Sequence, residues 1–155
     1  ESLNRVIVTA FEELDKIVDL IHDEWFDLDD VRFDEEAGVM EIPFRRIWHD
    51  RPGRVLKNRL IYRVEEVDVL RCLLRFANVI RYEIHGQGQV GPHSFNCLKH
   101  DEIHGLLILC VDPGCELTVE VDEIHAEYRE IEYRGKSKIT RGLFWHSDSA
   151  AVYDV

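Results

Sequence analysis

Cysteine is scarce in this chain, with four residues at irregular spacing in a sequence of 155 residues. So few cysteines exclude a fold that depends on a network of disulfides. Cys72 and Cys110 lie within apolar runs, which is typical of small buried residues. A chain of this length buries about 68–70% of its unfolded surface and can form a core without disulfides. We therefore expect a single domain, residues 1–155, with reduced cysteines and a cytoplasmic location.

Long apolar runs are also missing. No run approaches the roughly 20 residues that a membrane-spanning helix needs. Methionine occurs once, at Met40, and we therefore expect the sequence to be a trimmed or processed chain. Bases are outnumbered, with 19 Lys and Arg against 31 Asp and Glu and a net charge of −12. Because such a surface repels phosphates, we expect neither nucleic acid nor a membrane as a partner.

The acids are unevenly distributed along the chain. Residues 1–36 contain 13 acids and three bases, whereas residues 45–63 contain seven bases and a single acid, Asp50. Basic segments with interspersed aromatic residues can bind single-stranded nucleic acid by stacking. They can equally neutralise an acidic part of the same chain, and the overall negative charge favours this second interpretation.

The spacing of apolar residues predicts a helix followed by strands. Over residues 3–22, apolar side chains recur at intervals of three, four and seven, as on one face of an amphipathic helix. The residues of that face are Phe11, Leu14, Ile17, Val18 and Ile21. From residue 25 to about residue 133 the period changes to two, which is typical of strands with one buried face. Residues 134–155 are at first polar and basic, and we expect a C-terminal tail there.

Several segments of the β-rich body have local signals of their own. Residues 35–38 have the composition of a hairpin turn, and Pro43 in the strand that follows suggests an edge position or a kink. Residues 66–78 fit either a short helix or a strand, and we favour the strand. Residues 103–111 and 117–128 are expected to pair as a hairpin.

The predicted fold class is thus α+β and predominantly antiparallel β. One N-terminal amphipathic helix packs on a meander-like sheet, which closes as a sandwich or as a partly open barrel. The alternation of apolar and polar residues indicates that one face of the sheet is buried and the other is solvated.

Histidine is abundant, with eight residues, and three of them belong to a repeated tripeptide, Glu-Ile-His. The tripeptide occurs at residues 83–85, 102–104 and 123–125. On neighbouring strands these imidazoles and carboxylates would share one sheet face, where they could bind zinc or simply pair across the strands. We favour pairing, and therefore no cofactor. The alternative is a metal-binding or metal-dependent hydrolytic domain that holds zinc with His85, His100, Glu102 and His104.

No pattern predicts catalysis by a side-chain nucleophile. Ser94 lies beside His93 but lacks the Gly-x-Ser-x-Gly turn that positions a nucleophilic serine. Residues 86–91 have the form Gly-x-Gly-x-x-Gly, but no helix is predicted after them, as a dinucleotide-binding loop requires. We assign no catalytic residue and favour a protein that is not an enzyme.

Three short stretches resemble the opening of small bacterial strand-rich domains, in which a Leu/Ile-His-Asp step precedes a strand, a turn and a second strand. These stretches are Ile21-His22-Asp23, residues 28–33 and residues 38–42. Residues 105–111 and 117–121 are similar to the closing hairpin of the same domains. Some of these domains are immunity proteins of polymorphic toxin systems, of the immunity-protein-50 kind. The resemblance covers residues 21–126 and implies a strand-rich fold and the neutralisation of a toxin, but it supplies no catalytic residue.

The predicted function is non-enzymatic binding of a basic protein partner. Acids of the N-terminal region would form the contact surface, because complementary charge accelerates the association of proteins. The competing interpretation is a solvated surface that only aids solubility. The candidate contact residues are Glu12, Asp15, Asp19, Asp23, Asp27 and Asp30.

Overall fold

The computed structural model describes residues 3–86, 90–103, 105–112, 114–142 and 146–147. Strands dominate it, and the two longest, β6 and β11, have 15 and 17 residues. The elements, in chain order, are β1 (Arg5–Val8), the 3-10 turn η1 (Phe11–Glu13), α1 (Asp15–Ile21), β2 (Trp25–Asp27), the 3-10 turn η2 (Leu28–Asp30), β3 (Arg32–Asp34), β4 (Val39–Ile47), β5 (Arg54–Asn58), β6 (Tyr62–Phe76), β7 (Val79–Gly86), β8 (Pro92–Asp101), β9 (Leu106–Asp112), β10 (Cys115–Val121), β11 (Ala126–Gly142) and β12 (His146–Ser147).

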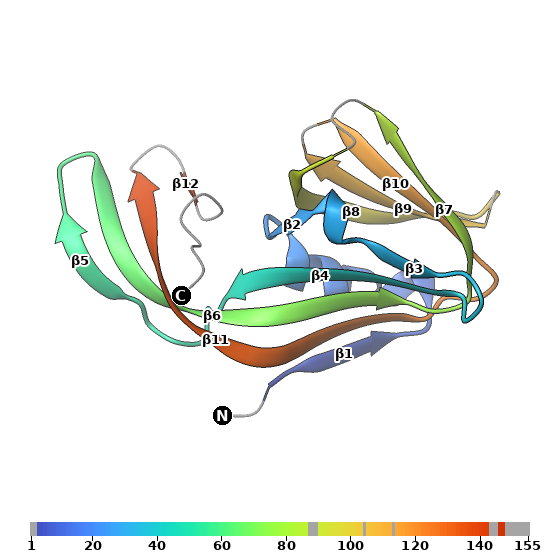
Figure 1. Cartoon of the computed structure of the whole chain (residues 1–155), viewed down its shortest axis with the longest axis horizontal. Coiled ribbons are helices and arrows are strands. Elements are labelled where there is room, and N and C mark those ends of the chain that lie inside the picture. The colour runs from blue at the N-terminus through green and yellow to red at the C-terminus, as the bar shows by residue number, and fades with distance from the viewer. Residues whose placement is uncertain (1–2, 87–89, 104, 113, 143–145, 148–155) are drawn as a thin grey trace.

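The described strands form one antiparallel sheet that is curled into a half-barrel (Figure 1). Along the sheet they follow the order β1-β11-β6-β4-β2-β8-β9-β10-β7, while β3 pairs with β4, β5 with β6 and β12 with β11. The short helix α1 contacts β8 and β1. Within the described residues no helix is long and apolar enough to cross a membrane. The predicted class, strand-rich and antiparallel with one N-terminal helix, is confirmed.

The main hydrophobic core lies inside the curl. Large aromatic side chains from different strands are fully buried there, among them Phe76, Phe95 and Tyr128. Phe95 stacks on Phe26 with ring centroids 4.3 Å apart and meets Phe44 edge-on at 5.2 Å. Burying one such side chain contributes about 1.5–3 kcal/mol, so packing between the two halves of the sheet stabilises its curvature.

The N-terminal helix is shorter than predicted. Strand β1 occupies the first part of residues 3–22 and pairs with β11, with Val6 opposite Tyr128. Only α1 is α-helical, and Ile17 and Ile21 are buried on it, as the predicted apolar face requires. The prediction is wrong for the first part because β-branched valine and isoleucine favour a strand where β11 offers an edge.

Strands β6 and β11 continue together beyond the body of the protein as an arm (Figure 1). Strand β5 pairs with the outer part of β6, and β12 pairs with the outer part of β11. We define the arm as residues 51–68 and 134–142. A hydrophobic cluster separate from the main core supports it, formed by Ile47, Val67, Val69 and Ile139.

The arm contradicts the prediction that a C-terminal tail begins at residue 134. Residues 134–142 belong to β11, which contains register shifts on either side of Tyr133. Such bulges bend a strand and increase its twist, so one strand can pair within both the body and the arm. The alternation of apolar and polar residues that predicts a strand is weak in residues 134–142, because one of the inward positions is Ser137, which is polar although buried.

Other predictions for the β-rich body are confirmed. Residues 35–38 form the turn between β3 and β4, and most of residues 66–78 belong to β6. Strands β9 and β10 pair as a hairpin, but the strand expected over residues 117–128 is divided between β10 and β11. The edge position suggested by Pro43 is wrong, because β4 lies between β6 and β2. Pro43 falls between the part of β4 that pairs with β3 and the part that pairs with β2, so it interrupts no ladder on that side.

A polar cluster joins the arm to the body. The Asp68 carboxylate accepts hydrogen bonds from the Tyr133 hydroxyl at 2.8 Å and the Arg51 guanidinium at 3.3 Å, and Lys136 Nζ lies 3.7 Å away. The Arg51 guanidinium also stacks over Trp48, 3.7 Å from the ring centroid. Burial alone would raise the pKa of Asp68, but these donors and charges together hold the pKa below its ordinary value.

Replacing Asp68 with asparagine should therefore destabilise the protein at neutral pH but not in acid. Because the folded-state pKa is lowered, the carboxylate stabilises the fold above its unfolded pKa, near 3.8, and this contribution disappears as the pH falls through the folded-state pKa. We expect the free energy of unfolding to fall by about 1–2 kcal/mol at pH 7, and by progressively less as the pH falls through the folded-state pKa.

Urea denaturation over this pH range measures the effect, with Asp122→Asn as the control at an exposed carboxylate. The control should change the free energy of unfolding little at any pH. An equal loss for Asp68→Asn at both ends of the range would contradict the assignment.

Candidate functional site

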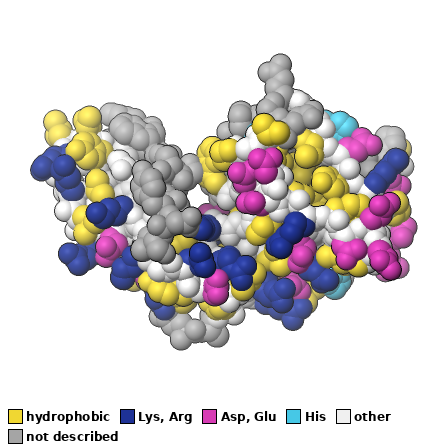
Figure 2. Space-filling model, viewed as in Figure 1, with side chains coloured by type: hydrophobic (Ala, Val, Ile, Leu, Met, Phe, Trp, Pro, Cys, Tyr) yellow, Lys and Arg dark blue, Asp and Glu magenta, His cyan; other side chains and the backbone are white. Residues whose placement is uncertain are grey.

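An open cleft of about 400 Å³ lies where β2 runs from the end of α1 between β4 and β8. Its charged lining is acidic except for one base, Arg45. Figure 2 shows acidic and hydrophobic side chains side by side on the part of the body that faces the arm. The other lining residues are Asp23, Glu24, Trp25, Phe26, Asp27, Asp30, Pro43, Phe44, Ile47 and Pro92.

Strand β2 places consecutive side chains on opposite faces of the sheet. Phe26 is buried and stacks on Phe95, whereas Trp25 remains 36% exposed. Trp25 pairs with Arg45 of β4 on one side and with Ser94 of β8 on the other, so both edges of β2 are held. The indole is thus presented from a strand inside the sheet and not from a loop.

The chain enters β2 through a sharp stop at the end of α1. Asp23 has a φ of 66°, the left-handed conformation in which many helices end and which aspartate tolerates better than most residues. Its N–H donates to the carbonyl of Phe95 at 2.9 Å, and the N–H of Phe95 donates to the carbonyl of Glu24 at 2.9 Å. These two bonds attach the beginning of the cleft to β8.

The rim of the cleft is formed by the 3-10 turn η2. Asp27 Oδ1 accepts a hydrogen bond from the N–H of Asp29 at 2.9 Å and so caps the turn. Leu28 anchors the turn in the core, and Asp30 lies exposed at its end. Neither Asp27 nor Asp30 forms an ion pair with any residue that the structure describes. Their charges are therefore not neutralised by the described part of the chain.

A buried polar network lies next to the cleft and contacts one of its lining residues. The Glu130 carboxylate, whose side chain is 1% exposed, accepts hydrogen bonds from the Tyr128 hydroxyl at 2.6 Å and from Arg46 Nη1 at 3.3 Å. Arg46 Nε lies 3.9 Å from the carboxylate of Glu24, which lines the cleft. Cys72 Sγ lies 3.8 Å from the Tyr128 hydroxyl. The network therefore connects the acidic lining to the core strands β6 and β11.

Burial changes the acidity of this network. It raises the pKa of the Cys72 thiol to about 12 and raises the pKa of the Tyr128 hydroxyl well above its ordinary value, and the Glu130 carboxylate adds to both shifts. Burial also raises the pKa of the Cys115 thiol. All three groups stay protonated at neutral pH, so neither of these thiols supplies a thiolate nucleophile.

The six acids predicted to contact a partner fall into two groups. Three of them, Asp23, Asp27 and Asp30, line the cleft, so the structure brings these together. The others are exposed on η1 and α1 and do not line it. This second group consists of Glu12, Asp15 and Asp19.

The bases of residues 45–63 are not used as expected. Arg46 pairs with Glu24, but Arg51 and Arg63 pair with acids of the arm itself. The interpretation that this segment neutralises the acidic N-terminal region is right for Arg46 and wrong for the outer part of the segment. Three bases there have no ion-pair partner among the residues that the structure describes, namely Arg54, Lys57 and Arg59.

The residues of the zinc hypothesis lie on different strands. His85 is on the edge strand β7, His100 is on β8, and Glu102 follows β8 in an exposed turn. Because β9 and β10 separate β7 from β8, the structure does not bring His85 and His100 together. His104 lies outside the described residues. Among those that are described, no three His, Cys, Asp or Glu side chains are grouped to hold a metal ion.

Two features of the site were not predicted from the sequence. Trp25 could have been noticed, because it is a large apolar residue directly after Glu24 and two positions before Asp27 in an acidic stretch. The pair Arg46–Glu130 has no local signal, because 84 residues separate its members. It depends on the pairing of distant strands.

Comparison with known proteins adds no relative. The chain matches no protein-family profile, no curated protein and no solved structure. Its function is therefore argued from the geometry and charge of the cleft.

Proposed function

We propose that the chain is a non-enzymatic binding module whose acidic cleft engages a basic protein partner. The observation that carries this proposal is Trp25, which is 36% exposed in an open cleft together with Asp27 and Asp30. Binding energy at protein interfaces is concentrated in a few residues, and tryptophan is enriched among them. An exposed tryptophan that is held by strands on both sides is suited to this role.

The chemistry of the cleft selects a basic, partly apolar segment. A Lys or Arg side chain of the partner can lie over the Trp25 ring, a contact that contributes about 0.5–2 kcal/mol depending on desolvation. It can at the same time pair with the carboxylates of Asp27 or Asp30. The exposed acids on η1 and α1 extend the negative field, which accelerates the approach of a basic protein.

A basic toxin is a partner of this chemical class. The resemblance of residues 21–126 to immunity proteins of polymorphic toxin systems supports this assignment, and a cytoplasmic, bacterial setting follows from it. The surface that such a partner would contact includes Asp23 as well as Trp25, Asp27 and Asp30. No metal or other cofactor is required for binding of this kind.

Capture by the immobilised full chain tests the proposal. The cleft variant Asp27→Asn/Asp30→Lys removes two negative charges and adds one positive charge, so the net charge rises by three, while asparagine keeps the cap of η2. The control variant Glu35→Gln/Glu36→Lys makes the same change in net charge in the exposed turn between β3 and β4. We expect a basic protein to be retained by the unchanged chain and by the control, and to bind the cleft variant at least about tenfold more weakly.

Equal retention by the cleft variant and the control would refute the cleft as the contact surface. It would indicate that net charge alone draws basic proteins to the chain. Failure of the unchanged chain to retain any basic protein from cells of its source would count against the proposed function itself.

A further inference from the structure

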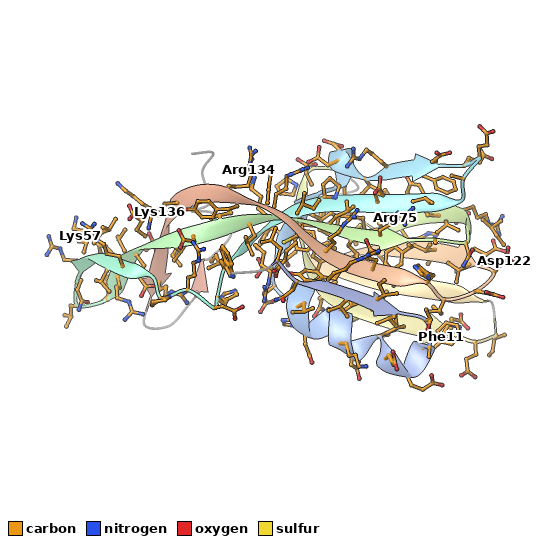
Figure 3. All side chains as sticks on the ribbon, turned by 90° about the horizontal axis from the view of Figure 1, so that it is seen from below. Phe11, Lys57, Arg75, Asp122, Arg134 and Lys136 are labelled. Carbon is orange, nitrogen blue, oxygen red and sulfur yellow. The ribbon has the colours of Figure 1, made fainter. Side chains whose placement is uncertain are left out.

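The outer end of the arm is both apolar and basic. Leu60 is 90% exposed, Ile61 53% and Val55 49%, although these side chains are of the kind that usually lie in a core. Lys57 lies at the outer end of the arm, with Arg134 and Lys136 closer to the body (Figure 3). Figure 2 shows hydrophobic and basic side chains together at this end of the molecule.

The arm and the rest of the chain carry opposite charge. Residues 51–68 and 134–142 contain nine bases and three acids, whereas residues 1–50 and 69–133 contain ten bases and 26 acids. The acids of the arm are in part already paired within it, as Glu65 is with Arg63 and Arg141. The bases at its outer end therefore keep their charge available for an external surface.

Within one copy the end of the arm does not lie on the acidic cleft. Among the described strands, β5 pairs only with β6, and its end projects away from the half-barrel (Figure 1). A second copy has no such restriction. The cleft of the second copy presents an exposed tryptophan, Trp25, and acids that form no ion pair with a described residue, Asp27 and Asp30. The end of the arm presents exposed leucine and isoleucine beside bases that have no ion-pair partner among the described residues. The two surfaces are therefore complementary.

We propose that the end of the arm of one copy docks in the acidic cleft of a second copy. Leu60 and Ile61 would cover Trp25, and Lys57 and Arg59 would face the carboxylates of the η2 rim. A two-fold symmetric pair makes this contact twice, so two modest contacts act together. The inference rests on the proposed function, because it requires that the cleft accepts a basic, partly apolar segment.

The same arm could instead contact an anionic membrane or nucleic acid, since both present negative charge to exposed bases. Neither of these partners would use the cleft. A second copy is favoured because the complementary surface is present in the chain itself, with an aromatic anchor as well as charge.

Sedimentation of the full chain tests the proposal with three variants. The arm variant is Lys57→Glu/Arg59→Glu, at two exposed positions without an ion pair among the described residues. Its control is Lys16→Glu/Lys99→Glu, which makes the same charge change on the body. The cleft variant is again Asp27→Asn/Asp30→Lys. Circular dichroism first establishes that each variant is folded.

We expect the unchanged chain and the control to form dimers at low ionic strength. These dimers should dissociate into monomers in about 0.5 M salt, because at this concentration the attraction between exposed charges extends over only a few ångströms. The arm variant and the cleft variant should each self-associate at least about tenfold more weakly. A mixture of the two variants should form a heterodimer, because one intact arm meets one intact cleft in it. Complementation of this kind does not arise from misfolding.

A chain that stays monomeric at low salt would overturn the inference. Dimers that persist in both variants, or a mixture that does not complement, would overturn it as well. Binding of monomers to phosphatidylserine vesicles or to single-stranded DNA, lost in the arm variant, would assign the arm to those partners instead. In any of these cases, weaker binding of a captured basic protein by the cleft variant than by the unchanged chain would leave the proposed function standing without self-association.

Discussion

Replacing Arg46 with methionine should lower the free energy of unfolding by about 3–5 kcal/mol, because it leaves a buried carboxylate without its cation. Glu130 has a side-chain exposure of 1%, and Arg46 is the base within 3.3 Å of it. The Tyr128 hydroxyl also donates to this carboxylate, but a neutral donor compensates a buried charge only in part.

The double variant Arg46→Met/Glu130→Gln separates loss of charge balance from loss of packing. Glutamine keeps an oxygen that can accept from the N–H of Asn4, as Glu130 Oε1 does at 2.9 Å. We expect it to recover more than half of the stability that the single variant loses, because a pair removed as a whole leaves no unpaired charge.

Arg75→Met provides the matched control on the neighbouring strand β6. Arg75 and Glu41 are 3.9 Å apart with side chains 36% and 32% exposed, so their pair should contribute no more than about 1 kcal/mol. Urea denaturation of the four proteins measures the differences. If Arg46→Met costs as little as Arg75→Met, the buried network does not stabilise the fold as described.

Replacing Trp25 with alanine should weaken binding of a basic partner by about 30-fold or more, which corresponds to about 2 kcal/mol at an interface hot spot. Folding should be affected far less, because Trp25 is 36% exposed while its neighbour Phe26 provides the core contact. Titration calorimetry with the captured partner measures the affinity.

Ile80→Ala is the control for the loss of exposed apolar area. Ile80 is 47% exposed on the edge strand β7, away from the cleft. Its removal should leave the affinity unchanged. Similar losses for Trp25→Ala and Ile80→Ala would indicate a general hydrophobic effect, and no loss for Trp25→Ala would remove this residue from the contact.

The β-rich body could be predicted because alternation is a local property of the sequence. The turn at residues 35–38 and the strand within residues 66–78 are identified by their own composition. The first part of residues 3–22 could not be assigned correctly, because the choice between helix and strand is decided by β11. In that pairing Arg5 lies opposite Arg129, more than a hundred positions along the chain.

The arm was missed for a related reason. Residues 134–142 are expected to belong to a tail, because Lys136 and Lys138 alternate with Ser137 as well as with an apolar residue. Pairing with β6 gives this segment its structure. The charge of the arm was visible in the sequence, but its direction in space was not.

The site could be predicted only in part. Acidic residues are evident from composition, and half of the candidates line the cleft. What distinguishes Asp27 and Asp30 from Asp15 and Asp19 is their position beside Trp25, on a strand that lies between β4 and β8. That arrangement depends on long-range register, which a single sequence does not contain.

Hydrogen–deuterium exchange of the full chain, with and without the basic protein that it captures, tests the central claim most directly. The account predicts that partner binding slows exchange in residues 23–31 and 43–47, which form the cleft, and leaves β7 unchanged. Protection confined to α1 or to β7, with no change in residues 23–31, would contradict the assignment of the cleft as the binding site.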